Sequence, residues 1–104
     1  MDTTGHVYEL GGLKIEFYSH RVYVDGKEID LTNREYKILL VFIKHPDWIL
    51  NRGMIIDGAW GRDHAITERT VDSHVQGLRR EFGRRSACIE TIHGEGYRFN
   101  PKKV

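Results

Sequence analysis

The 104-residue sequence has a single cysteine, two prolines and no long run of apolar residues. One cysteine excludes an internal disulfide and a site built from several thiolates, which favours a reducing compartment. We expect Cys88 to be a small core residue. The polar start, residues 1–6, lacks the apolar segment of a signal peptide, and nothing has the length of a membrane helix. These absences predict a cytoplasmic protein without membrane contact.

Signatures of catalysis and metal binding are missing too. The six histidines form neither an HExxH motif nor a close pair with cysteines. No nucleophile elbow, phosphate-binding loop or dinucleotide fingerprint occurs. We therefore predict that the chain is not an enzyme and that it binds no metal or other cofactor.

The composition that is present, 39% hydrophobic and 30% charged residues, is typical of one globular domain. We expect that domain to span residues 1–104, with flexible ends at 1–6 and 101–104. Charge is distributed unevenly. Residues 1–68 carry 8 basic and 11 acidic side chains, a net charge of −3, whereas residues 69–104 carry 8 and 4, a net charge of +4. The distribution favours a polyanionic partner for the C-terminal part.

The first third of the chain predicts a sheet. Between residues 7 and 31, apolar and polar residues alternate with a period of two. Gly-Gly at 11–12, Ser-His at 19–20 and Asp-Gly at 25–26 interrupt the alternation, and Asp-Gly favours a two-residue hairpin turn. Three or four short antiparallel strands are the natural interpretation.

Two helices are predicted next. Thr32 to Glu35 reads as a capping box, and Pro46 ends the first helix. Its expected apolar face is Tyr36, Leu39, Leu40 and Ile43. A second, shorter helix follows the cap residue Asn51 and stops at Gly61. It should bury Ile55, Ile56 and either Ala59 or Trp60.

A third helix and a hairpin complete the pattern. The helix is expected over 67–82, with Val71, Val75, Leu78 and Phe82 on one stripe and Gly83 at its end. Strands over 89–93 and 97–100 should pair across the Gly-Glu-Gly turn at 94–96.

The side of the third helix opposite its stripe has the side chains of a DNA-reading surface. It presents Arg69, Ser73, Gln76 and Arg80, with Thr70, His74, Gly77 and Arg79 at its margins. Guanidinium groups suit phosphate or guanine, and an amide suits adenine. Exposed helices of other functions also carry such residues. Gly77 costs about 1 kcal/mol relative to alanine, which either a close approach to DNA or a packing contact inside the protein would offset.

Four strings together resemble the effector domain of OmpR/PhoB-type response regulators. They are LTNREY at 31–36 with Leu39-Leu40, WG at 60–61, RTVDSHV at 69–75 with Leu78-Arg79, and TIHGEGYRF at 91–99. The resemblance covers about residues 10–100. It implies an α+β winged helix-turn-helix fold with an N-terminal antiparallel sheet, three helices and a C-terminal β-hairpin wing. It further implies sequence-specific binding of double-stranded DNA by a transcriptional regulator of a two-component system. The helix 67–82 would enter the major groove and the wing 89–100 would lie near the minor groove.

The resemblance also implies roles for individual residues. Positions that contact the DNA backbone in the family are held here by Arg52, Trp60, Arg69, Thr70, His74, Arg79 and Tyr97. The loop that contacts RNA polymerase corresponds to Gly61, Arg62, Asp63, His64, Ala65 and Ile66. Candidates for contacts to bases or grooves are Ser73, Gln76, Gly77, Arg80 and His93.

The sequence departs from the family pattern at three positions. Relatives often carry arginine where this chain has Gln76, Gly77 and His93. Glu95 at the wing tip adds repulsion from phosphate. We therefore expect base reading to depend more on Ser73, Gln76 and Arg80, with adenine a natural partner for Gln76.

The resemblance extends to partners and to a missing domain. Such domains bind as homodimers on repeated half-sites and contact RNA polymerase. A phosphate-accepting receiver domain ordinarily precedes them and is absent from these 104 residues, so an excised effector domain and a stand-alone regulator both stay open. The alternative function is a winged-helix module that contacts proteins and has little DNA affinity. Binding to DNA through several arginines falls steeply with salt, which separates the two.

Overall fold

The computed structural model describes residues 6–61 and 65–104 and begins with a four-stranded sheet. Its strands are antiparallel and follow the order β1-β2-β3-β4. They are β1 (Val7–Leu10), β2 (Leu13–Glu16), β3 (Arg21–Val24) and β4 (Lys27–Ile29). Asp25 and Gly26 both adopt positive φ, 54° and 81°, as a tight hairpin turn requires. The meander is confirmed, and it has four strands.

Helix α1 (Asn33–Lys44) begins where the capping box predicts. Thr32 Oγ1 accepts a hydrogen bond from Glu35 N at 3.1 Å, and Glu35 Oε1 accepts one from Thr32 N at 3.0 Å. The predicted apolar face packs on the core but is incomplete. Leu40 and Ile43 are half-buried against the core. The missed core residues are Ile38, Val41 and Phe42.

The burial of α1 on more than one side follows from its central place. It packs against both α2 (Arg52–Ala59) and α3 (Glu68–Phe82). Helix α2 begins at the predicted cap, where Asn51 Oδ1 accepts a hydrogen bond from Met54 N at 2.8 Å. Of the two alternatives for its core residue, Ala59 is buried and Trp60 is half-buried.

Helix α3 carries the predicted stripe. Its members Val71, Val75, Leu78 and Phe82 are at most 2% exposed. Gly83 ends the helix with a φ of 59°. A 3-10 helix that the sequence did not predict, η1 (Gly83–Cys88), then leads into the hairpin, and Cys88 lies in the core as expected.

The C-terminal hairpin pairs β5 (Ile89–Ile92) with β6 (Gly96–Phe99). The prediction of a flexible end at 101–104 needs correction. These residues contain a short 3-10 helix, η2 (Pro101–Lys103), and Lys103 Nζ lies 2.8 Å from Glu90 Oε2. The ion pair ties this end to the hairpin. At the other end of the chain, residues 1–5 lie outside the described residues.

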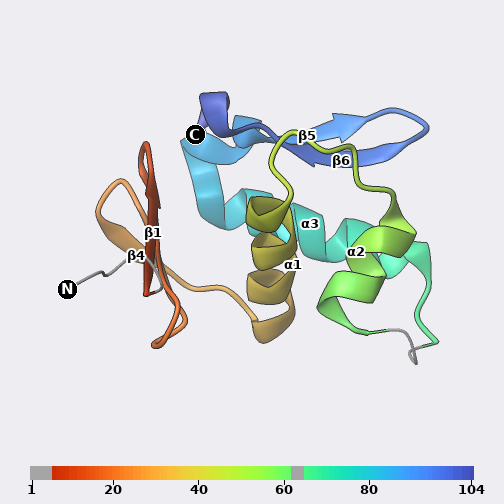
Figure 1. Ribbon diagram of the computed structural model, residues 1–104, viewed down its shortest axis with the longest axis horizontal. Coiled ribbons are helices and arrows are strands. Elements are labelled where there is room, and N and C mark those ends of the chain that lie inside the picture. Colours follow the sequence, from red (N-terminus) through yellow and green to blue (C-terminus); the bar gives the residue numbers. More distant parts are fainter. Residues whose placement is uncertain (1–5, 62–64) are drawn as a thin grey trace.

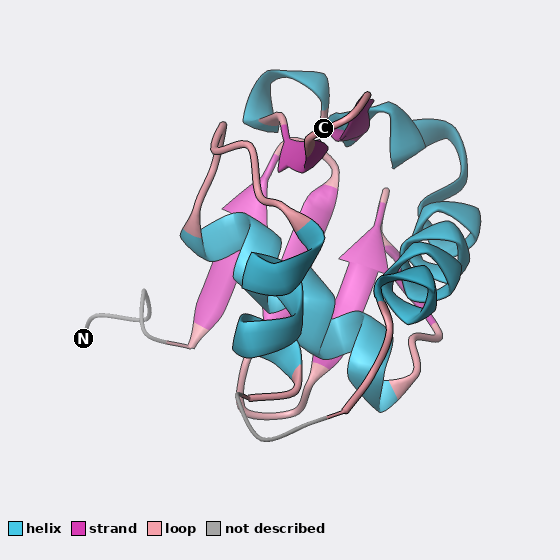
Figure 2. Cartoon of the chain, turned by 90° about the vertical axis from the view of Figure 1, so that its right-hand side faces the viewer, coloured by secondary structure: helices cyan, strands magenta, loops and turns pink. Residues whose placement is uncertain are grey.

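The elements form the α+β arrangement of a winged helix-turn-helix protein. The four-stranded sheet lies at one end, and the β5–β6 hairpin, the wing, extends toward the opposite end (Figure 1). Viewed from that opposite end, the helices lie in front of the four-stranded sheet (Figure 2). Among the described residues, no helix combines the length and apolarity needed to cross a membrane.

Candidate nucleic-acid interface

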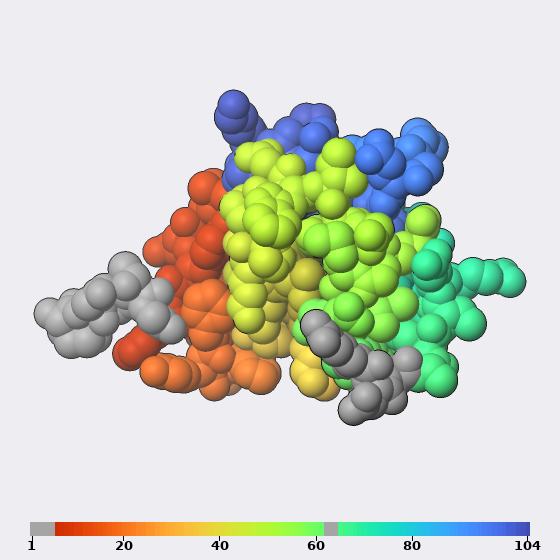
Figure 3. Space-filling view, turned by 45° about the vertical axis from the view of Figure 1, so that its right-hand side comes forward, coloured from red at the N-terminus to blue at the C-terminus, as the bar shows by residue number. Residues whose placement is uncertain are grey.

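The first turn of α3 and the tip of the wing lie at the same edge of the molecule (Figures 1 and 3). On α3, the predicted outward side chains Arg69, Ser73, Gln76 and Arg80 are exposed. Those at its margins, Thr70, His74 and Arg79, are half-buried. This edge therefore presents the start of an exposed helix face, with Arg69 in its first turn, next to a hairpin tip, and Arg80 continues the face in the last turn of α3.

Gly77 does not belong to this face, which corrects its prediction as a groove residue. It is buried against α1. A Cβ at this position would lie 2.1 Å from Glu35 Oε2, the carboxylate that also closes the capping box. Of the two explanations for a glycine inside the helix, the structure favours the packing contact within the protein.

Asp72 joins three elements of the site. Its Oδ1 accepts a hydrogen bond from Arg52 Nε of α2 at 2.7 Å. The same oxygen accepts one from the Tyr97 hydroxyl of β6 at 2.6 Å. Sequence reasoning missed Asp72 as a functional candidate, although it lies within the family-like string 69–75.

The surroundings of Asp72 favour its charged form. Partial burial by itself raises the pKa of Asp72, but the hydrogen bonds from Arg52 and Tyr97 outweigh it, so the pKa lies below its ordinary value. Burial, followed by the bond to the carboxylate, raises the pKa of Tyr97. Asp72 thus stays an acceptor at neutral pH and Tyr97 stays a donor.

Tyr97 is more deeply placed than its predicted contact with DNA phosphate requires. The residue is only 5% exposed, and its hydroxyl is engaged by Asp72. The guanidinium groups of Arg52 and Arg79 lie 5.4 and 5.5 Å from the centre of its ring. In the protein alone, Tyr97 is therefore a core residue between two arginines.

Arg79 connects α3 to the wing. Its Nε and Nη2 donate to the carbonyl oxygen of Ile89 at 3.1 and 2.8 Å. Nη2 also donates to Thr91 Oγ1 at 2.7 Å. These bonds orient the guanidinium before any ligand arrives.

A second group of side chains lies where α2 ends. The Arg34 guanidinium is 4.6 Å from the centre of the Trp60 ring and donates through Nη1 to the carbonyl oxygen of Ala59. The Trp60 and His74 rings are 5.4 Å apart. The structure thus brings together Trp60 and His74, both predicted site residues, and adds Arg34. Sequence reasoning did not single out the half-buried Arg34, although it lies within the family-like string 31–36.

The wing tip is exposed but its base is fixed. His93, Gly94 and Glu95 are exposed, which agrees with the predicted position of His93. Gly96 is buried, with a φ of 140°, and a Cβ there would lie 2.1 Å from the carbonyl oxygen of Leu50. The segment that precedes α2 is therefore packed directly against the wing.

The predicted polymerase-contact loop is only partly described. Ala65 is exposed, while Gly61 and Ile66 are half-buried. Arg62, Asp63 and His64 lie outside the described residues.

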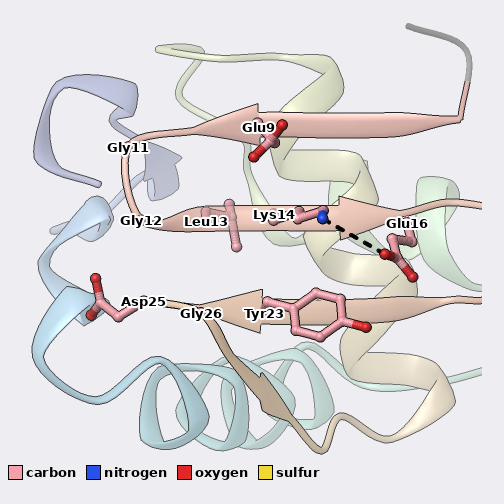
Figure 4. Close-up of a pocket in the computed structure, with 9 residues that line it drawn as sticks. All are labelled: Glu9, Gly11, Gly12, Leu13, Lys14, Glu16, Tyr23, Asp25 and Gly26. Atoms are coloured by element: carbon pink, nitrogen blue, oxygen red, sulfur yellow. Dashed lines mark ion pairs between the residues drawn. The ribbon is translucent and has the colours of Figure 1, made fainter. Parts of the chain in front are cut away.

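A cavity of about 460 Å³ lies elsewhere, over β1–β3 (Figure 4). Lys14 lines it, and its Nζ lies 3.8 Å from Glu16 Oε2 and 5.6 Å from the centre of the Tyr23 ring. Across residues 6–61 and 65–104, no three histidine, cysteine or acidic side chains form a group suited to a metal ion. The cavity has mixed charge and is separate from the face of α3.

Comparison with known protein families gives one match over most of the chain. The family model described as "Transcriptional regulatory protein, C terminal" matches residues 26–99. The phosphate regulon transcriptional regulatory protein PhoB of Pseudomonas aeruginosa is 39% identical over 95 residues, which cover 90% of this chain and 42% of PhoB. The transcriptional regulatory protein SrrA of Staphylococcus aureus is 35% identical over 100 residues, covering 92% of this chain and 42% of SrrA. The chain thus spans less than half the length of these relatives.

Solved structures agree with the sequence relatives. The DNA-binding domain of the response regulator AdeR, crystallised in complex with an intercistronic region, is similar with a TM-score of 0.79 and 30% identity. That match covers 89% of this chain and 98% of the AdeR domain. The response regulator DrrB of Thermotoga maritima, an OmpR/PhoB homologue, gives a TM-score of 0.81 and 28% identity over 91% of this chain and 44% of DrrB.

Proposed function

Because this chain belongs to the family of C-terminal domains of OmpR/PhoB-type transcriptional regulatory proteins, we propose that it binds double-stranded DNA in a sequence-specific manner. Helix α3 enters the major groove and the β5–β6 wing lies near the minor groove. Support comes from the AdeR domain, whose structure was solved with an intercistronic region. The observation that carries the proposal is the exposed face of α3, which presents Arg69 in its first turn and Arg80 in its last, with the start of the helix at the same edge as the wing tip (Figure 1).

The side chains on this face divide into two roles. Arg69 at the start of α3 suits a phosphate, because the guanidinium forms charge-assisted hydrogen bonds without regard to sequence. Ser73, Gln76 and Arg80 suit base edges, because the major groove admits a helix and displays distinct donors and acceptors. Gln76 pairs naturally with adenine.

A matched pair of arginine variants tests the DNA-binding proposal. Selection from a random duplex library first supplies a preferred site. Arg69→Ala should weaken binding to both that site and a scrambled duplex and should reduce the magnitude of the salt slope by about 0.9. Arg21→Ala removes the same charge from an exposed position on β3 and should leave both quantities unchanged. Equal affinities of the wild type and the Arg69 variant in anisotropy titrations would contradict the proposal.

Base reading by Gln76 has its own test. Gln76→Ala should change preference at one base pair by about 1 to 3 kcal/mol, with a smaller effect on general affinity. Site selection with both proteins measures this directly. Identical preferred motifs would rule out a reading role for Gln76.

The proposal includes a cytoplasmic location, homodimers on repeated half-sites, and a contact between RNA polymerase and the loop 61–66. The resemblance of the chain to OmpR/PhoB-type regulators supports these assignments. Mass measurements on duplexes with one and two copies of the selected half-site test the dimer. A complex that stays at one copy per two-site duplex would argue against it.

A second candidate function, contact with another protein and little DNA affinity, is favoured by one observation. Trp48, Ile49 and Met54 are 55%, 40% and 40% exposed and lie in and next to the connection between α1 and α2. Exposed apolar groups of this kind are typical of protein interfaces. Absence of enriched sequences in the library selection would favour this candidate.

A further inference from the structure

We infer that Asp72 is a positioning residue for DNA binding: its carboxylate orients Arg52 for the phosphate backbone and, through the buried Tyr97, fixes the wing against α3. The inference rests on the proposed function. It assigns a role to an acidic side chain that, by charge alone, opposes binding to DNA.

One oxygen atom makes both contacts. Oδ1 of Asp72 accepts from Arg52 Nε at 2.7 Å and from the Tyr97 hydroxyl at 2.6 Å. The contacts join α2, α3 and β6, and the bonded residues are 20 and 25 positions apart in the sequence. The side chains of Arg52 and Asp72 are 30% and 42% exposed, so the pair lies at the surface.

The ion pair orients Arg52 without consuming its guanidinium. It uses Nε, so neither terminal nitrogen is engaged by the carboxylate. An arginine held by one of its nitrogens loses less conformational freedom when the others meet a phosphate. Ordering before binding therefore favours the complex.

The hydrogen bond from Tyr97 to Asp72 also positions the wing. Tyr97 N donates to the carbonyl oxygen of Leu50 at 3.0 Å, and Leu50 N donates to that of Tyr97 at 2.8 Å. With its hydroxyl on Asp72, this residue fixes β6 against both α3 and the segment before α2. The distance between the recognition helix and the wing is thereby defined.

Positioning and simple electrostatics predict opposite signs for one substitution. If Asp72 only repels phosphate, then Asp72→Ala strengthens binding. If it positions Arg52 and Tyr97, Asp72→Ala weakens binding despite the loss of negative charge. Asp72→Asn removes the same charge but keeps an Oδ1 that can accept both hydrogen bonds.

The experiment compares these two variants on the duplex selected by the wild type, at several salt concentrations. We expect Asp72→Ala to bind about tenfold more weakly than Asp72→Asn, the effect of about one lost hydrogen bond to a charged group. The salt slope of Asp72→Ala should also be smaller in magnitude than that of Asp72→Asn by about 0.9, which corresponds to the loss of one phosphate contact. Asp57→Ala removes an exposed carboxylate of α2 and should bind like the wild type. All titrations are run below the temperature at which any variant begins to unfold.

Repeating the comparison in the Arg52→Ala protein separates positioning from general support of the fold. The difference between alanine and asparagine at position 72 should shrink there, because the positioned side chain is gone. An undiminished difference would overturn the inference, as would an Asp72→Ala protein that binds as tightly as Asp72→Asn with the same salt slope. A wild type that selects no duplex would instead overturn the proposed function and this inference with it.

Discussion

Replacing Gly96 by alanine is expected to detach the wing from the rest of the domain. Gly96 adopts a φ of 140°, which side-chain-bearing residues rarely adopt. The added Cβ would lie 2.1 Å from the carbonyl oxygen of Leu50 and 2.9 Å from Asn51 Cα. Both are backbone atoms, so no side-chain rotation relieves the clash, and the two chain segments must separate.

Two contributions set the magnitude. Backbone strain at such a φ costs about 1 to 3 kcal/mol. Separation breaks the two hydrogen bonds between Leu50 and Tyr97, of 2.8 and 3.0 Å, each contributing about 1 kcal/mol. The free energy of unfolding should therefore fall by about 3 to 5 kcal/mol. For a domain of this size that lowers Tm by more than about 12 °C.

Gly94 provides the matched control. It lies in the same turn with a φ of 77°, but a Cβ there meets no atom within 4 Å. Gly94→Ala should therefore cost only the backbone strain, about 1 to 2 kcal/mol. Urea unfolding of both variants gives the two free energies. The steric reasoning is refuted if Gly96→Ala destabilises no more than Gly94→Ala.

Three further predictions concern other contacts. Hydrogen bonds, first of all from Lys103, lower the pKa of Glu90 from 4.5 to about 2, so its contribution to stability is complete above about pH 4.5 and is lost as pH falls toward 2. Urea unfolding of Glu90→Gln across this range should show a smaller loss than in wild type, and equal losses would contradict it. Gly77→Ala should leave the free energy of unfolding nearly unchanged, because a gain of about 1 kcal/mol in helix propensity is offset by the displacement of Glu35. In a Glu35→Ala background the same substitution should raise the free energy of unfolding by about 1 kcal/mol. Equal effects of Gly77→Ala in both backgrounds would exclude the contact. Burial raises the pKa of Cys88 to about 11, so a thiol reagent at pH 8 should react at the rate of unfolding, and immediate reaction would contradict the buried position.

The fold could be predicted where one face of an element is buried and the other is not. Helix α3 has this form, and its stripe was identified correctly from Val71 to Phe82. Helix α1 does not, because residues 38–43 are all apolar and a continuous run carries no periodicity. Its buried side depends on the neighbours α2 and α3, which a local pattern does not contain.

In the candidate site, too, the local sequence pattern predicts exposure but not the contacts between elements. The exposure of Arg69, Gln76 and Arg80 follows from their places opposite the stripe. The contacts of Asp72 and Gly77 do not, because their partners lie on other elements, far away in sequence. For Gly77 this distinction reverses the assignment, from a residue that approaches DNA to one that packs against Glu35.

The number of arginines at the candidate interface affects how many copies of the protein are needed to bind one DNA target. Arg69 and Arg80 are the exposed arginines of α3, and Arg52 and Arg79, which are half-buried and oriented by bonds within the protein, supplement them. Glutamine and glycine stand at 76 and 77, and neither adds positive charge. A single copy should therefore make few phosphate contacts and bind with a shallow salt slope. Two linked or adjoining copies on repeated half-sites gain affinity through effective concentration without any new contact to DNA. Weak individual domains thus favour recognition of a repeated target over a single half-site.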